Sequence, residues 1–228
     1  MAPEISTGAQ IDQLVVSARA LAQAAATSGK RYILGISGPP GAGKSTLSAA
    51  LEAALDGDAV VIPMDGFHLP NSVLEERGLG NVKGAPNTFD VEGYAALLAR
   101  LRPPVPREQG GLGTQHTAEV VLAPKFNRGA EAPEPDAIAV SPGVPLVITE
   151  GNYLLHDQDG WEKIRPLLDA VWHLDVPRQE VQRRLVARRI SHGHAEDAAE
   201  AWVHDVDLPN YDTVQANKHR ADTIITLA

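Results

Sequence analysis

The chain has 228 residues, of which 43% are hydrophobic and 4% aromatic, and its formal net charge is −9 at pH 7. This length is typical of one domain with a sizeable core. The net negative charge argues against a nucleic-acid-binding surface, because phosphate backbones require clustered lysines and arginines. The chain contains no cysteine, which excludes disulfides, thiol nucleophiles and cysteine-based zinc sites.

The first predicted element is a helix over residues 10–28, where apolar residues recur at helical spacing. We interpret it as a packing helix, within residues 1–30, that precedes the main core. A buried strand over about 32–37 and a helix over about 44–55 follow, and they flank a glycine-rich loop.

This loop, residues 38–45, reads Gly-Pro-Pro-Gly-Ala-Gly-Lys-Ser and matches the G-x-x-x-x-G-K-[ST] pattern of a phosphate-binding loop. Its glycines let successive N–H groups point inward, and the helix N-terminus adds its dipole to the same anion site. Lys44 would reach the β- and γ-phosphates, and the Ser45 hydroxyl is placed to ligate Mg²⁺. We expect ATP and Mg²⁺ to bind here. The predicted nucleotide contacts are Gly38, Pro39, Pro40, Gly41, Ala42, Gly43, Lys44, Ser45 and Thr46.

Asp65 follows a short apolar run at 59–63, which we predict to be the second strand. In open α/β sheets the ligand crevice lies at the carboxyl ends of the strands, so Asp65 should face the same crevice as the phosphate loop. Its carboxylate could accept the proton of an attacking hydroxyl or hold the magnesium shell. The alternative, that Asp65 only caps the following turn, stays open.

Glu150 ends a third apolar strand at 146–149, which is the Walker B arrangement with glutamate in place of the commoner aspartate. A carboxylate at this point can bind Mg²⁺ directly or through water. Asn152 and Tyr153 would project beside it into the crevice. A solvated acid at the end of a strand is the alternative.

The remaining segments continue the alternation of strands and helices, which implies a parallel sheet with helices on both faces. The fold class is therefore α/β, a P-loop NTPase three-layer sandwich in a single domain over 1–228. The further predicted elements are a helix within 89–101 with Asp90 as N-cap, strands at 171–174 and 223–227, and helices at 177–191 and 195–206.

One region, at about 103–145, interrupts this alternation because it is rich in proline, glycine and acids. Within it, residues 119–126 could form an edge strand. The region is either a surface loop or a small flap that covers the substrate, since long loops in compact domains are often functional.

Four arginines cluster within residues 183–189 of the helix predicted at 177–191, in an otherwise acidic chain: Arg183, Arg184, Arg188 and Arg189. Arg184 and Arg188 share one helix face because they are four residues apart. A lid, formed by helices at about 178–207, could bring these guanidinium groups onto a triphosphate. Alternatively, they form a solvated basic face that pairs with Glu180 or Glu196.

Together these motifs resemble the kinase family that includes uridine kinase, phosphoribulokinase and bacterial type I pantothenate kinase. The resemblance spans about 31–227 and is closest to bacterial proteins labelled fructose-transport-system or nucleoside/nucleotide kinase-like. It rests on the loop at 38–45, Asp-Gly-Phe at 65–67, Lys-Gly-Ala-Pro-Asn-Thr-Phe-Asp at 83–90, Glu-Gly-Asn at 150–152, Asp-Val-Pro at 175–177, and the tail with Trp202, Asn210 and Arg-Ala-Asp at 220–222.

The resemblance implies that Asp65 is the general base toward an acceptor hydroxyl and that Glu150 lies near magnesium. It implies that Arg188 is a lid arginine on the phosphates, with Arg184 beside it, and that Asn210 or a close neighbour borders the acceptor or nucleotide pocket.

The acceptor is implied to be a small molecule with a hydroxyl group, namely a sugar, a nucleoside or a pantothenate-like compound. This chain has Asp-Gly-Phe-His at 65–68 where uridine kinase has Asp-Ser-Phe-Tyr, and the uridine and pantothenate pocket pattern is not matched at 116–128. The polar candidates for recognising the acceptor are His68, Lys83, Arg128 and Tyr153.

A second hypothesis is a regulatory nucleotide switch of the GTPase type. Its Asp-x-x-Gly motif should follow the Walker B strand directly, but the matching letters stand at 157–160, seven residues beyond Glu150. Its guanine motif Asn-Lys-x-Asp is incomplete, because residues 217–220 read Asn-Lys-His-Arg.

Location and assembly are predicted from what the sequence lacks and from the resemblance. No apolar run approaches the roughly 20 residues that cross a bilayer, and the sequence begins Met-Ala-Pro-Glu without an apolar signal core. We expect a cytoplasmic protein with no membrane partner and no nucleic-acid partner. Many relatives form dimers, so a homodimer that uses the N-terminal helix stays open.

Overall fold

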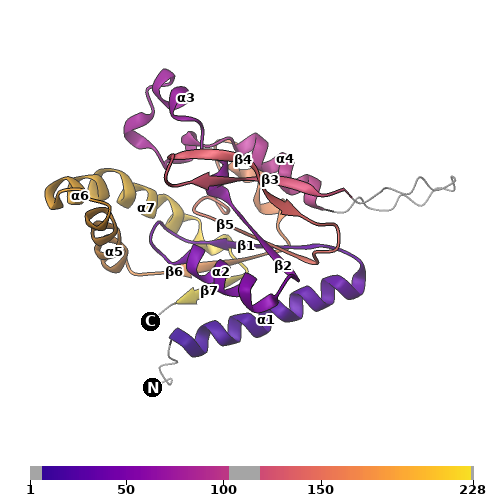
Figure 1. The fold of residues 1–228 in the computed structure, drawn as a ribbon. Helices are drawn as coiled ribbons and strands as arrows, with labels where there is room; N and C mark the ends of the chain where they lie inside the picture. The colour runs from indigo at the N-terminus through magenta and orange to yellow at the C-terminus, as the bar shows by residue number, and fades with distance from the viewer. Residues whose placement is uncertain (1–6, 103–118, 227–228) are drawn as a thin grey trace.

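A five-stranded parallel sheet forms the centre of the computed structural model, which describes residues 7–102 and 119–226 (Figure 1). Every neighbouring pair in this sheet is parallel, as the sequence predicts. The middle strands are almost fully buried, which explains their continuous apolar runs. In spatial order the strands are β2 (Ala59–Pro63), β5 (Leu146–Gly151), β1 (Tyr32–Ser37), β6 (Ala170–Asp175) and β7 (Thr223–Thr226).

Helices cover both faces of this sheet, which confirms the three-layer architecture (Figure 1). Alternate residues of β1 point to opposite sides: Leu34 and Ile36 join one apolar cluster and Ile33 joins the other. The first cluster takes side chains from α1 (Thr7–Ser28), α2 (Lys44–Leu55) and α5 (Arg178–Ser191). The second takes side chains from α4 (Val91–Leu101) and α7 (Leu208–Ala216).

Some helices differ from the sequence prediction. The helix predicted at 195–206 is α6 (Glu196–Trp202) followed by one π-helical turn over Val203–Asp207, and α7 was not predicted. Asp90 is the N-cap of α4, as predicted, and accepts a 2.9 Å hydrogen bond from the Gly93 N–H. The other short helices are α3 (Asn71–Glu76) and 3₁₀ turns at Met64–Phe67, Gly80–Val82, Pro86–Thr88, Trp161–Lys163, Arg165–Leu167 and Lys218–Arg220.

A separate antiparallel hairpin stands beside the main sheet. The strand predicted at 119–126 is β3 (Val121–Asn127), and its partner β4 (Ala132–Val140) was not predicted. The surface-loop alternative is therefore wrong for these two strands, while residues 103–118 lie outside the described part of the chain. The hairpin packs so closely on the turn after β2 that a Cβ atom at Gly66 would lie 2.5 Å from the carbonyl oxygen of Pro124.

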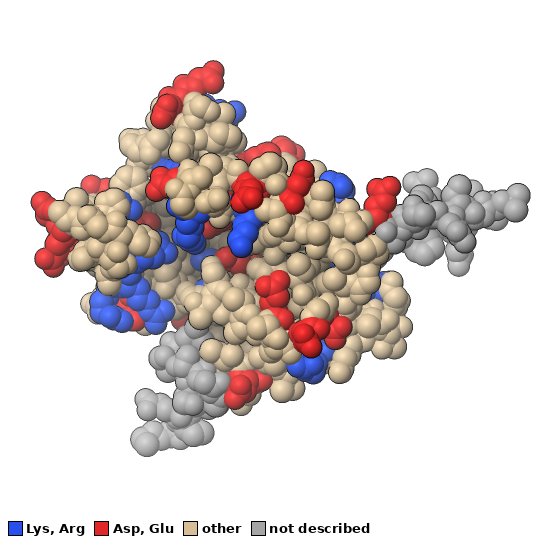
Figure 2. Space-filling model, in the orientation of Figure 1, with Lys and Arg blue, Asp and Glu red and all other residues tan. Residues whose placement is uncertain are grey.

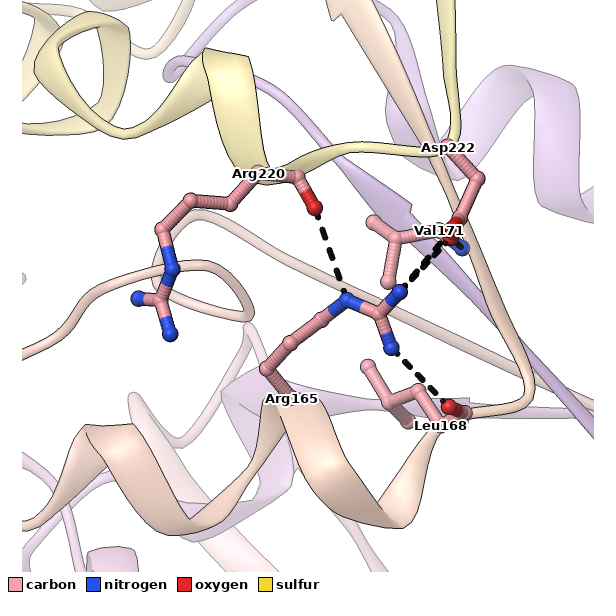
Figure 3. Close-up of polar contacts among 5 residues, drawn as sticks. All are labelled: Arg165, Leu168, Val171, Arg220 and Asp222. Atoms are coloured by element: carbon pink, nitrogen blue, oxygen red, sulfur yellow. Dashed lines mark hydrogen bonds and ion pairs between the residues drawn. The ribbon is translucent and has the colours of Figure 1, made fainter.

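A cluster of hydrogen bonds around Asp222 connects the start of the edge strand β7 to the neighbouring chain segments (Figure 3). Arg165 donates two 3.0 Å hydrogen bonds to the Asp222 carboxylate, which also accepts one of 2.6 Å from the Val171 N–H. The same guanidinium donates to the carbonyls of Leu168 and Arg220.

In the described part of the chain, no helix is long and apolar enough to cross a membrane.

Candidate active site

A cavity of about 470 Å³ opens at the carboxyl ends of β1, β2 and β5. Figure 2 shows lysine and arginine side chains gathered around a hollow between the β3–β4 hairpin and the α5–α6 helices. The cavity brings together most of the residues that the sequence singles out. Its lining is Pro40, Gly41, Gly43, Lys44, Ser45, Thr46, Asp65, Arg128, Glu150, Asn152, Arg184, Leu185, Arg188 and His192.

Lys44 is held at the base of this cavity by neutral oxygens. Its Nζ donates hydrogen bonds of 2.9 Å to the carbonyls of Gly38 and Pro39 and one of 2.7 Å to Oδ1 of Asn152. Burial lowers the pKa of the Lys44 ammonium, and the carboxylates of Glu150 and Asp65 oppose that shift. The amine is thus fixed where a phosphate would meet it.

Ser45 and Glu150 lie side by side in the same cavity. The Ser45 hydroxyl donates a 2.8 Å hydrogen bond to Oε1 of Glu150, whose residue is only 6% exposed. Burial raises the pKa of the Glu150 carboxyl, while the Lys44 ammonium lowers it. A buried carboxylate beside a hydroxyl suits a cation that prefers oxygen ligands.

These donors fit Mg²⁺, which is commonly bound through one or two carboxylates together with substrate phosphates and water. Among the described residues, no cluster of three or more His, Cys, Asp or Glu side chains could hold a metal ion by itself. Ser45 and Glu150 would therefore hold the cation together with the phosphates of a nucleotide.

Asp65 lies in the 3₁₀ turn over Met64–Phe67, directly after β2, and faces the cavity. Its Oδ2 is 3.9 Å from a guanidinium nitrogen of Arg128, which lies in the turn between β3 and β4. The carboxylate is 38% exposed, so a small molecule in the cavity can reach it. The hairpin thus places a cation next to the predicted general base.

Two of the five arginines of α5, Arg184 and Arg188, line the cavity. Arg184 donates to Oε1 of Glu180 at 2.6 Å and to the Gly41 carbonyl at 3.4 Å, whereas Arg183 is exposed and pairs with Glu180. Burial lowers the pKa of the Arg188 guanidinium, and the Asp207 carboxylate opposes the shift. Glu180 therefore pairs with both Arg183 and Arg184, as the alternative expects, but Arg184 and Arg188 also line the cavity.

Three other predicted residues lie beyond the lining of this cavity. Tyr153 is fully buried and its hydroxyl donates a 2.6 Å hydrogen bond to the Gly84 carbonyl. His68 packs between the rings of Phe89 and Phe126, and its Nδ1 is 2.8 Å from the Asp65 carbonyl oxygen. Asn210 lies on α7 and is 7% exposed.

Lys83 and the buried loop residues also lie outside the lining. Lys83 donates to Oδ1 of Asn71 at 2.8 Å and to the Glu131 carbonyl at 3.0 Å. Gly38 and Pro39 contribute the carbonyls that hold Lys44, and Ala42 packs in the core. Their contacts with an acceptor or a nucleotide, like those of Tyr153, stay predictions.

Sequence reasoning did not single out two lining residues, Leu185 and His192. The Leu185 side chain packs on Gly41 of the phosphate loop, whose φ is +73°. A Cβ atom added at Gly41 would lie 3.2 Å from this leucine. His192 continues the four-residue spacing of Arg184 and Arg188, so extending that helical pattern by one turn could have found it.

Comparisons with known proteins find relatives of this chain, although no family model matches the sequence. A solved chain described as a "putative fructose transport system kinase" from Silicibacter sp. TM1040 is 38% identical, with a TM-score of 0.76 and coverage of 91% of this chain and 98% of that one. Protein YggC of Escherichia coli, named as uncharacterized, is 34% identical over 87% of this chain and 78% of its own length. The "putative uridine kinase C227.14" of Schizosaccharomyces pombe is 30% identical over 86% and 83%.

The chain belongs to the uridine kinase-like P-loop kinases. This confirms the family resemblance and, together with the parallel sheet, the predicted fold class. The chemistry of P-loop kinases is phosphoryl transfer from ATP, for which the fold supplies positioning and charge neutralisation more than covalent chemistry.

Proposed function

We propose that this kinase-family protein uses ATP and Mg²⁺ to phosphorylate a hydroxyl group of a small metabolite, namely a sugar, a nucleoside or a pantothenate-like acceptor. The observation that carries the proposal is the position of Asp65. It faces the same cavity as Lys44 and the Ser45–Glu150 pair, so one carboxylate is free of the phosphate loop and available to an acceptor.

The residues divide the reaction between them. Lys44 and the loop amides stabilise the charge that develops on the phosphoryl oxygens. Asp65 orients the acceptor hydroxyl and takes its proton as the oxygen attacks the γ-phosphorus, and the bond to the β–γ bridging oxygen breaks to release ADP. When bound, Mg²⁺ would neutralise charge on the β- and γ-phosphate oxygens.

Helices α5 and α6 are proposed to act as the lid of a single domain. Arg189 lies over the ring of Trp202, with 4.6 Å between the guanidinium carbon and the ring centroid, and this contact couples the two helices. Movement of α5 toward the loop would bring Arg184 and Arg188 onto the phosphates. Closure of this kind excludes water, which matters because hydrolysis competes with transfer.

The names of the relatives point to different acceptors, since one mentions fructose transport and another uridine. We therefore propose the reaction and the donor, with the acceptor given only as a class. A cytoplasmic location stays an expectation from the sequence.

The test is acceptor-stimulated release of ADP from Mg²⁺-ATP by purified protein, scored over a panel of sugars, polyols, nucleosides and hydroxy acids. We expect stimulation by at least one compound and its loss in Lys44→Ala, which should also bind nucleotide more weakly. Nucleotide hydrolysis that no compound stimulates would favour the regulatory switch instead.

A further inference from the structure

The β3–β4 hairpin packs tightly on the turn that carries Asp65. A Cβ atom at Gly66 would lie 2.5 Å from the Pro124 carbonyl oxygen, and the ring centroid of Phe126 lies 4.8 Å from that of His68. Backbone and side chain of β3 thus both contact this turn. Packing therefore fixes where the end of the hairpin lies relative to Asp65.

The turn that joins β3 to β4 also has a defined backbone. Oδ1 of Asn127 accepts hydrogen bonds from the N–H groups of Gly129, at 2.9 Å, and Ala130, at 3.1 Å. An asparagine side chain that bonds to the backbone just ahead of it stabilises a tight turn. Arg128 lies inside this turn, and its side chain, which is 69% exposed, lines the cavity.

The Arg128 guanidinium contributes little to holding the fold together. Among the described residues it makes no hydrogen bond, and its one ion pair is the contact of 3.9 Å with Oδ2 of Asp65. An exposed pair at this distance contributes little to stability. The five N–H donors of the guanidinium form a planar fork that matches a carboxylate or a phosphate. A ligand in the cavity therefore meets an arginine whose donors are not committed to the fold.

The cations that line the cavity lie on two sides of it. Lys44 and Arg184 both donate to carbonyls of the phosphate loop, and Arg188 follows Arg184 by one turn of the same helix. Arg128 comes instead from the hairpin and lies beside Asp65, the carboxylate proposed to meet the acceptor hydroxyl. The phosphate loop thus has its own cations for ATP, and Arg128 is a cation on the acceptor side.

We infer that Arg128 binds an anionic group of the acceptor, a carboxylate or a phosphate, while Asp65 meets the hydroxyl to be phosphorylated. The acceptor is then an acidic hydroxy compound, such as a hydroxy acid or a sugar phosphate. This inference rests on the proposed function and narrows its acceptor class.

The charge of Asp65 explains why such a cation is needed. An acidic acceptor next to this carboxylate would be repelled, because like charges held close together are disfavoured. Arg128 offsets that repulsion from 3.9 Å away. Because the guanidinium and the carboxylate are neighbours, an anion bound to Arg128 also holds the rest of a small acceptor close to Asp65. A neutral compound has no group that uses the charge of the guanidinium.

The test compares acceptors in matched pairs that share a carbon skeleton: a polyol with the corresponding hydroxy acid, and a sugar with its phosphate. The value of kcat/KM is measured for each compound in wild type, Arg128→Gln and the control Lys125→Gln. Lys125 is exposed on the same hairpin but does not line the cavity, so its replacement removes the same unit charge away from the site.

We expect wild type to prefer the acidic member of a pair. In Arg128→Gln, kcat/KM for that member should fall about tenfold to hundredfold, because a charge-assisted, two-pronged contact is lost. The neutral member, KM for ATP and the control should stay close to wild type. The pair that shows the preference tells whether the anion is a carboxylate or a phosphate.

Arg128→Lys separates charge from geometry. Lysine keeps the positive charge but lacks the planar fork, so it should restore part of the preference that glutamine removes. The ratio of acidic to neutral kcat/KM within one variant is also insensitive to partial unfolding, because loss of folded protein lowers both values equally.

The outcomes distinguish the inference from the proposed function. A wild-type preference for the neutral member, or a ratio that Arg128→Gln leaves unchanged, would overturn the inference and leave the kinase function standing. An equal fall for both members, or a rise in KM for ATP, would show that Arg128 acts on the phosphates or on Asp65, which also contradicts the inference. A wild-type protein that no acceptor stimulates would overturn the proposed function and the inference with it.

Discussion

The Nζ of Lys44 lies 2.7 Å from Oδ1 of Asn152, so the loop after β1 and the loop after β5 meet in one hydrogen bond at the centre of the site. All three acceptors of the ammonium hydrogen bonds are neutral oxygens. An incoming phosphate can therefore displace them without first breaking an ion pair.

The first prediction tests the role of these three neutral oxygens around the Lys44 ammonium group. Asn152→Asp places a carboxylate on Lys44 with almost no change in volume, and that carboxylate would compete with phosphate for the ammonium. We expect KM for ATP to rise about tenfold or more, because hydrogen bonds to charged groups are the stronger ones. Asn152→Ala, the control, should change KM for ATP much less. Equal effects of the two substitutions in titrations of ATP would contradict the account.

A second prediction concerns the proposed general base. Asp65→Asn should lower kcat by about 10² to 10⁴, the range that general bases contribute. Nucleotide affinity should be largely spared, because Asp65 stands outside the phosphate loop. Single-turnover transfer and nucleotide titration measure the two effects, and full transfer activity in the variant would refute the base assignment.

The lid proposal predicts different results for two arginines of the same helix. Arg188→Ala removes a cation from the cavity and should lower kcat by about 10² or more, by analogy with other arginines that stabilise phosphoryl charge. Arg183→Ala is the control, because Arg183 is 71% exposed and pairs only with Glu180 among the described residues. If steady-state kinetics show the same kcat for Arg188→Ala and wild type, α5 is not the lid.

The cluster in Figure 3 predicts a change in stability without a change in chemistry. Asp222→Ala removes the acceptor of the Val171 N–H and strands the Arg165 guanidinium, so we expect a loss of about 1–3 kcal/mol in the free energy of unfolding. Asp212→Ala, which removes an exposed partner of Arg178, should cost under about 1 kcal/mol. Urea titrations measure both, and equal losses would contradict the structural role.

His173 predicts an acid-dependent loss of stability. Both of its ring nitrogens are buried without a partner in the described structure, and burial lowers its pKa to about 4. Between pH 6.5 and 4 the unfolded chain binds a proton at this residue and the folded chain does not, so stability falls as the pH falls. The effect reaches about 3 kcal/mol at most.

Substitution by leucine should remove that dependence. The free energy of unfolding of His173→Leu should stay near the wild-type value at pH 7 and exceed it increasingly as the pH falls from 6.5 to 4. Parallel pH profiles of the two proteins in denaturant titrations would show that the histidine titrates normally.

The sequence predicts the parts of the fold that are fixed by local pattern. The phosphate loop locates β1 and α2, and apolar runs locate β2, β5 and β6 because buried parallel strands are hydrophobic on both faces. The strand β4 escapes prediction because it carries Pro133 and Pro135 and is mostly exposed, so it shows neither alternation nor high strand propensity. The helix α7 escapes because the π turn before it adds a residue and breaks the helical spacing.

The site likewise contains residues that local motifs predict and contacts that depend on the tertiary fold. Lys44, Ser45, Asp65 and Glu150 come from motifs at the ends of strands, so their meeting in one cavity follows from the parallel topology. The proximity of Arg128 to Asp65 depends on the β3–β4 hairpin, and it cannot be deduced from local spacing.

The most direct test of the central claim follows the γ-phosphoryl group itself. The protein is incubated with γ-labelled ATP, Mg²⁺ and the panel of hydroxyl compounds, and the labelled products are separated. We predict that label appears in an organic phosphomonoester with one acceptor class, and that Asp65→Asn lacks this product while still binding nucleotide. Label found only in inorganic phosphate, at a rate that no compound changes, would contradict the proposal that this protein is a small-molecule kinase.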